Sequence, residues 1–94
     1  MARLTYSEKA LRDLERLTEF LAQSDPVAAA ETVELIEEAV SVLRRHPMIG
    51  RMVEAGLREL VISRGRSGYV ALYSIEEDQG AVLILALRHQ RELE

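Results

Sequence analysis

The sequence predicts an α+β fold in which a helical hairpin packs on one face of a mostly antiparallel sheet, with elements in the order β-α-α-β-β-β. Apolar residues recur at helical spacing in the first half of the chain, and strand patterns separated by polar turns fill the second half. Helices grouped before a strand meander favour α+β over α/β. The chain has 94 residues, 48% of them hydrophobic, so we expect residues 1–94 to form a single domain with one core.

The first half is expected to begin with a short strand at residues 2–6 and to continue as two helices. Thr5 or Ser7 can cap the first helix, and Asp25 followed by Pro26 is a favourable start for the second. The apolar face of the first helix is expected to contain Leu11, Leu14, Leu17 and Leu21, and that of the second Ala28, Ala29, Thr32, Leu35, Ile36, Ala39, Val42 and Leu43.

The second half is expected to form three strands. Residues 57–63 and 69–75 show alternating patterns, and residues 64–68 form the turn between them. Residues 76–80 form a second polar turn. Residues 81–87 are apolar without interruption, which is typical of a strand that lies centrally in a sheet or is covered on both faces.

Composition limits the partners and the compartment. The net charge is −4, and a protein whose dominant partner is bare nucleic acid usually carries a basic excess. The absence of cysteine excludes disulfides and thiolate metal ligands. The N-terminus does not resemble a signal peptide, and no apolar run approaches the roughly 18 residues that a membrane span needs. We therefore expect a cytoplasmic protein with no membrane association.

Three short motifs lie in the second half of the chain. His46-Pro47-Met48-Ile49-Gly50-Arg51 follows the helices and resembles the "hP-x-x-G-R" joint of ParE-like toxins. Arg66-Ser67-Gly68-Tyr69-Val70-Ala71-Leu72-Tyr73 resembles the Ser-Gly-Tyr-x-x-x-Tyr strand of the same proteins. Leu85-Ala86-Leu87-Arg88-His89-Gln90-Arg91-Glu92 resembles their Arg-His-x-Arg ending. With the order of the elements, these motifs identify the chain as a member of the ParE/RelE toxin superfamily (type II toxin–antitoxin, plasmid-stabilisation type), closer to ParE.

The resemblance implies a toxin that forms a hetero-oligomer with a cognate antitoxin. In the family, a segment of the antitoxin folds along the helical hairpin and the sheet. A largely apolar free surface on the two helices would support such a groove, and helices that bury apolar residues on one face only would contradict it. The residues expected to contact the antitoxin are Leu14, Leu17, Leu21, Leu35 and Tyr73.

The superfamily contains two functional classes. The RelE-like members cleave mRNA on the ribosome, using lysines before the Ser-Gly-Tyr turn, an arginine after its tyrosine, and an arginine and a tyrosine near the C-terminus. This chain has Val61 and Ser63 on the corresponding strand and Val70 after the tyrosine. The resemblance therefore implies a ParE-like inhibitor that binds DNA gyrase, without chemistry, cofactor or metal. The ribosome-dependent mRNA endonuclease is the alternative, and a non-toxic antitoxin-binding module is a third.

Arginine and tyrosine are the candidate target-binding residue types. Guanidinium forks suit carboxylate or phosphate, and both residue types are enriched at interface hot spots. In a nuclease, His89 with Arg88 and Arg91 would carry the chemistry. In the alternative interpretation, the turn arginines are solvated, Tyr73 lies in the core under the helices, and Arg88 or Arg91 pairs with a nearby glutamate. The full expected target-binding set is Arg58, Arg64, Arg66, Tyr69, Arg88, His89 and Arg91.

Overall fold

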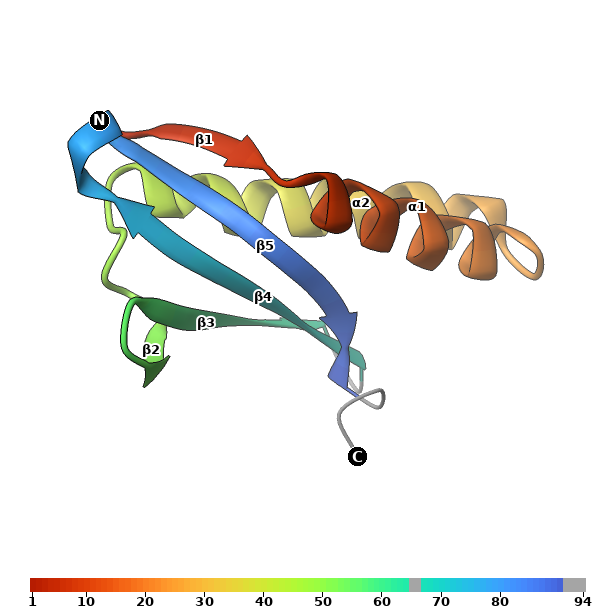
Figure 1. Cartoon of the computed structure of the whole chain (residues 1–94). Helices are drawn as coiled ribbons and strands as arrows, with labels where there is room; N and C mark the ends of the chain where they lie inside the picture. Colours follow the sequence, from red (N-terminus) through yellow and green to blue (C-terminus); the bar gives the residue numbers. More distant parts are fainter. Residues whose placement is uncertain (65–66, 91–94) are drawn as a thin grey trace.

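Two helices cover one face of a five-stranded sheet in the computed structural model, which describes residues 1–64 and 67–90 (Figure 1). The predicted α+β class and the packing of the hairpin on one sheet face are confirmed. None of the helices in this part of the chain is both long and apolar enough to cross a membrane. The elements are β1 (Arg3–Tyr6), α1 (Glu8–Ala22), α2 (Pro26–Ser41), η1 (Val42–Arg44), β2 (Arg51–Glu54), β3 (Leu57–Arg64), β4 (Ser67–Glu76), η2 (Glu77–Gln79) and β5 (Ala81–His89).

Both helices begin at side chains that satisfy N–H groups of the first turn. Ser7 precedes α1, and its Oγ accepts a hydrogen bond from the Ala10 N–H at 3.0 Å. Asp25 precedes α2, and its carboxylate accepts one from the Ala28 N–H at 3.1 Å. Of the two caps that the sequence allowed for α1, Ser7 is the one used, because Thr5 still belongs to β1.

The sheet has the strand order β1-β5-β4-β3-β2. β1 pairs with β5 in parallel, and the other neighbours pair antiparallel. β5 therefore has a strand on each side, which explains its uninterrupted apolar sequence and confirms its interior position. The turn between β3 and β4 is shorter than predicted, because Arg64 pairs with Ser67 across it.

The predicted order lacks one strand, β2. This strand forms a hairpin with β3 at the edge of the sheet, and Gly56 in the turn has φ +80°, a backbone conformation that favours glycine. All four residues of β2 are exposed. A strand that buries no side chain has no apolar alternation, so the sequence carried no signal for it.

A bulge at Leu85 keeps the core side chains of β5 on one face. The register changes from Leu72 opposite Ala86 to Tyr73 opposite Ile84, which leaves Leu85 as the extra residue. Ile84 and Leu87 consequently both point to the helices, although they are three positions apart in the strand, and both are fully buried. The other buried members of the core cluster are Ala10, Leu17, Ile36, Val40, Leu43, Ile62, Tyr69, Ala71, Tyr73 and Val82.

Candidate functional site: the open face of the sheet and the joint

The sheet has a second face that the helices do not cover, and we call it the open face. Residues paired across antiparallel strands point to the same side of a sheet. Val61 pairs with Val70, which pairs with Arg88, and Glu59 pairs with Leu72, which pairs with Ala86. Five of these side chains line one hollow of about 110 Å³. The open face is therefore defined by Glu59, Val61, Val70, Leu72, Ala86 and Arg88.

The centre of the open face is apolar, with one cation beside it. Val61 is 55% exposed, whereas its neighbours on this face, Val70 and Ala86, are only 8% and 5% exposed. Arg88 is exposed and forms no ion pair with any residue in the described part of the chain. Glu59 pairs instead with Arg51, at 2.9 Å between Nη2 and Oε1. A pair between Arg88 and Glu59 is thus not observed, and the other glutamates near Arg88 in the sequence, Glu92 and Glu94, lie outside the described residues.

Arg88 and His89 lie on opposite faces of β5. Arg88 lines the hollow of the open face, whereas His89 meets the buried ring of Tyr69 edge-on, with ring centroids 5.1 Å apart. Tyr69 is 4% exposed and belongs to the core beneath the helices. Successive side chains of a strand alternate between faces, so the two neighbours cannot converge on one group. The prediction that Tyr69 contacts a target is corrected, because its side chain is buried.

A second cluster holds the joint, the loop of residues 46–50 that connects the helices to β2. The Tyr73 hydroxyl donates a hydrogen bond to the Pro47 carbonyl at 2.6 Å and accepts one from the Gly50 N–H at 2.9 Å. Arg58 donates to the Met48 carbonyl at 3.2 Å and to the Gly50 carbonyl at 2.7 Å. The motif at residues 46–51 and Tyr73, the last tyrosine of the motif at residues 66–73, therefore contact each other. Their role in this structure is to fix the joint.

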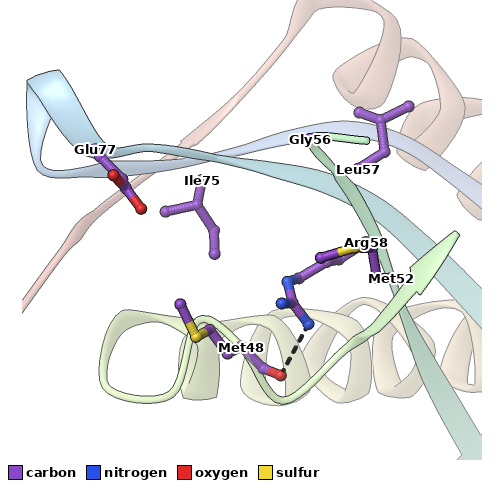
Figure 2. Close-up of a pocket in the computed structure, with 7 residues that line it drawn as sticks. All are labelled: Met48, Met52, Gly56, Leu57, Arg58, Ile75 and Glu77. Atoms are coloured by element: carbon purple, nitrogen blue, oxygen red, sulfur yellow. Dashed lines mark hydrogen bonds between the residues drawn. The ribbon is translucent and has the colours of Figure 1, made fainter. Parts of the chain in front are cut away.

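The joint borders a cavity of about 210 Å³, shown in Figure 2. Met48 and Met52 point into it from two sides, Ile75 lies above them in this view, and the Arg58 guanidinium donates a hydrogen bond to the Met48 carbonyl. Both methionines are largely exposed. Arg58 pairs with the buried Tyr73 and so lies on the helix side of the sheet. The structure thus does not bring Arg58 together with Arg88, contrary to the prediction of one target-binding set.

The remaining predicted target residues lie in or beside the part of the chain that is not described. Arg66 and Arg91 are outside the described residues, and for Arg64 only the backbone is placed. Of the seven predicted residues, Arg88 is the one placed on the open face. Val61 and Val70, which stand where the RelE-like members have cationic residues, are paired neighbours on this face.

The predicted antitoxin contacts change as well. Tyr73 has no exposed surface and Leu17 is 6% exposed, so neither is accessible to a partner, and both predictions are corrected. Leu14, Leu21 and Leu35 are half-buried. Most exposed residues of α1 are charged, so the predicted apolar groove along both helices is not found. The large apolar side chains exposed on α1 and α2 are those of Leu11, Phe20 and Val27.

Sequence reasoning missed Phe20, which is 71% exposed. Phe20 lies seven residues after Asp13, two helical turns further along the same face of α1. Asp13 contacts β5, but Figure 1 shows the tip of the hairpin projecting past the end of β5. A residue with core-like spacing is therefore left without a sheet to pack on. Its spacing from Leu17 is that of the buried face, so the sequence carried no signal that Phe20 would be exposed.

The family model of the ParE toxin of the type II toxin–antitoxin system parDE matches residues 4–94 of the chain. The chain belongs to this ParE toxin family. It is 37% identical to Toxin RelE3 of Caulobacter vibrioides over 84 residues, which is 89% of each chain. It is 32% identical to Toxin RelE2 of the same organism, over 99% of this chain and 100% of the relative.

Two solved structures of toxin–antitoxin systems have the same fold as this ParE-family chain. The chromosomal ParDE system from P. aeruginosa superposes with a TM-score of 0.78 at 24% identity, over 95% of this chain and 96% of the other. The toxin–antitoxin complex RelBE2 from Mycobacterium tuberculosis superposes with a TM-score of 0.61 at 28% identity, over 95% and 98%. The chain is accordingly a toxin of the type II toxin–antitoxin class.

Proposed function

We propose that this toxin acts by binding DNA gyrase and inhibiting it, and that a cognate antitoxin neutralises it. The observation that carries the proposal is the divergence of Arg88 and His89 onto opposite faces of β5. The apolar side chains accessible on the open face are the exposed Val61 and the half-buried Leu72, with the guanidinium of Arg88 on the same face, and this combination suits a protein partner. Interface cores are typically apolar with arginine and aromatic anchors.

Ribonuclease chemistry makes different demands. Cleavage needs a base for the 2′-hydroxyl, an acid for the leaving oxygen and cationic groups around the phosphate, all converging on one point. Among the six residues that define the open face, Arg88 is the single cation, and the neighbouring positions 61 and 70 hold valines. The higher TM-score against the ParDE system than against RelBE2 agrees with a ParE-like role.

The second candidate is a ribosome-dependent mRNA endonuclease. It is favoured by the names of the Caulobacter vibrioides relatives, which are RelE toxins. In that case His89 would be the acid or base, and it would have to turn away from Tyr69 to share a phosphate with Arg88. A non-toxic antitoxin-binding module is the third possibility.

An antitoxin partner is proposed for all of these functions. The two solved relatives are toxin–antitoxin systems, and the hairpin tip of this chain carries the exposed apolar residues Phe20 and Val27. Half-buried Leu14, Leu21 and Leu35 remain predicted contacts at the margin of the same helices.

The test is expression of the chain alone in bacteria, followed by two assays on purified protein: gyrase supercoiling and ribosome-dependent mRNA cleavage. We expect growth arrest and loss of supercoiling, with Arg88→Ala reducing inhibition and His89→Ala leaving most of it. Arg12→Ala is the matched control, since Arg12 is an exposed arginine on α1, 3.9 Å from Glu8. Cleavage that His89→Ala abolishes would establish the endonuclease, and unaffected growth would contradict both toxin functions.

A further inference from the structure

The end of β5 is held on one side by α1 instead of a strand. β1 pairs with β5 only as far as Tyr6 opposite Ile84. Beyond this point, the first residues of the helix supply the hydrogen bonds that a longer β1 would make. The Ser7 N–H donates to the Ile84 carbonyl at 2.9 Å, and the Ser7 Oγ donates to the Leu85 carbonyl at 3.1 Å.

Asp13 makes the last of these contacts along β5, one residue before Arg88. Its Oδ2 accepts a hydrogen bond from the Leu87 N–H at 3.0 Å, across a sequence separation of 74 residues. Asp13 is 8% exposed, in a helix face that otherwise packs apolar side chains against the sheet. Lys9 contacts the same oxygen at 2.9 Å from the solvent side.

A carboxylate at this position requires a specific reason. Burial of a charged group is costly unless it is hydrogen-bonded, and an apolar residue of similar size would pack more favourably against the core. An apolar residue would, however, leave the Leu87 N–H buried without an acceptor. Asp13 thus supplies the acceptor for the backbone N–H of Leu87, which is one residue before Arg88 in β5.

We propose that Asp13 is a positioning residue for the target-binding surface. By fixing the backbone of Leu87, it fixes the direction in which the next side chain, Arg88, leaves the strand toward the open face. It also fixes the direction of His89 toward Tyr69. Without Asp13, the last residues of β5 are held by β4 alone. The statement about backbone position stands by itself, and its consequence for inhibition rests on the proposed function.

Four variants separate positioning from general stability. Asp13→Ala removes the acceptor, and Asp13→Asn keeps one oxygen for the Leu87 N–H without the charge. Lys9→Ala removes the closer of the two ion pairs of Asp13, leaves Arg16 Nη2 at 3.9 Å from Oδ1, and keeps the acceptor. Thr32→Ala is the stability control, because Thr32 is buried on α2, its hydroxyl donates within that helix to the Ala28 carbonyl, and it forms no hydrogen bond to the described residues of β5.

The first measurement is amide hydrogen exchange of the free chain by NMR. In Asp13→Ala, we expect protection of Leu87 to fall at least about tenfold more than that of Ile84, whose hydrogen bonds do not involve Asp13. Asp13→Asn is expected to recover most of this protection, and Lys9→Ala to keep it. Thr32→Ala is expected to lower protection evenly along β5. An even loss in Asp13→Ala, or no recovery in Asp13→Asn, would overturn the positioning role.

The second measurement is inhibition of gyrase supercoiling at a temperature where all variants are folded. Asp13→Ala is expected to lose inhibition to the same degree as Arg88→Ala, and the double variant to lose little more, because both changes remove the same contact. Asp13→Asn and Thr32→Ala are expected to inhibit like the wild type. Full inhibition by folded Asp13→Ala would overturn the link to Arg88. If the wild type itself does not inhibit, the proposed function fails, while the exchange of Leu87 still decides whether Asp13 positions β5.

Discussion

The hydroxyl of Tyr73 occupies the space that any side chain at position 50 would need. A Cβ built on Gly50 would lie 2.5 Å from the Tyr73 hydroxyl and 2.6 Å from the Glu59 carbonyl. The same hydroxyl accepts the hydrogen bond of the Gly50 N–H. Glycine and tyrosine, 23 residues apart, are therefore a matched pair that closes the helical hairpin onto the sheet. Because the pair is buried in the joint, it positions the site and does not itself bind.

Removing the Tyr73 hydroxyl is expected to destabilise the fold. Tyr73→Phe keeps the ring in the core but deprives the Gly50 N–H and the Pro47 carbonyl of their partner. We expect a loss of about 1–3 kcal/mol in the free energy of unfolding, measured by urea denaturation. Tyr6→Phe is the control, since the hydroxyl of the half-buried Tyr6 forms no hydrogen bond with the described residues. This variant is expected to change the free energy of unfolding much less. Equal effects would show that the joint is not fixed in this way.

Gly50→Ala is expected to lower the stability of the fold more than Gly56→Ala, which changes a glycine in a turn. The new methyl group would overlap a backbone carbonyl as well as the tyrosine, and backbone atoms give way at a higher cost than a flexible side chain. Gly56→Ala meets no atom within 4 Å and suffers only from its φ of +80°, a cost of about 1–2 kcal/mol. Thermal unfolding of both variants tests the difference. A smaller loss for Gly50→Ala than for Gly56→Ala would contradict the predicted overlap.

The contribution of Asp13 to stability is expected to disappear in acid. Burial raises the pKa of Asp13, but the Leu87 N–H and the charge and hydrogen bond of Lys9 outweigh it, so the pKa lies below the ordinary 3.8. A carboxyl whose pKa is lowered by folding stabilises the folded state above its unfolded pKa and loses this effect as pH falls through the folded pKa. We expect the wild type to exceed Asp13→Asn in stability above about pH 5, with the difference shrinking below about pH 4. Urea unfolding at a series of pH values measures this, and a difference independent of pH would be the contrary result.

The apolar centre of the open face is expected to be required for inhibition. Val61→Lys places a charge beside Val70 and Arg88 without opening the core, because Val61 is already more than half exposed. We expect at least about a tenfold loss of gyrase inhibition, since a desolvated charge in an interface core costs more than 1.4 kcal/mol. Val27→Lys introduces the same charge at an exposed valine on the hairpin tip. Val27→Lys should leave gyrase inhibition unchanged. A loss of inhibition in both variants would contradict a gyrase contact at the open face.

The sequence predicted the elements that bury side chains and failed on the one that does not. The helix start at Pro26 follows from a capping residue and a proline in the local sequence. The interior position of β5 follows from its unbroken apolar run. β2 buries nothing, so its position at the sheet edge is decided by hydrogen bonds to β3. The bulge at Leu85 is equally invisible, because it depends on a register between two strands.

The candidate site divides in the same way. The motif residues identified the family, and the replacement of cations by Val61 and Val70 could be read from the sequence alone. The sequence could not show which residues share a surface. Adjacent residues such as Arg88 and His89 point to opposite faces, whereas distant residues such as Tyr73 and Gly50 contact each other. The sequence by itself determined the class of fold and the superfamily, since both depend on local pattern and residue type. The tertiary structure decided that Arg88 faces outward on an apolar sheet and that Tyr69 and Tyr73 do not, because strand register and helix packing assign each side chain to a face.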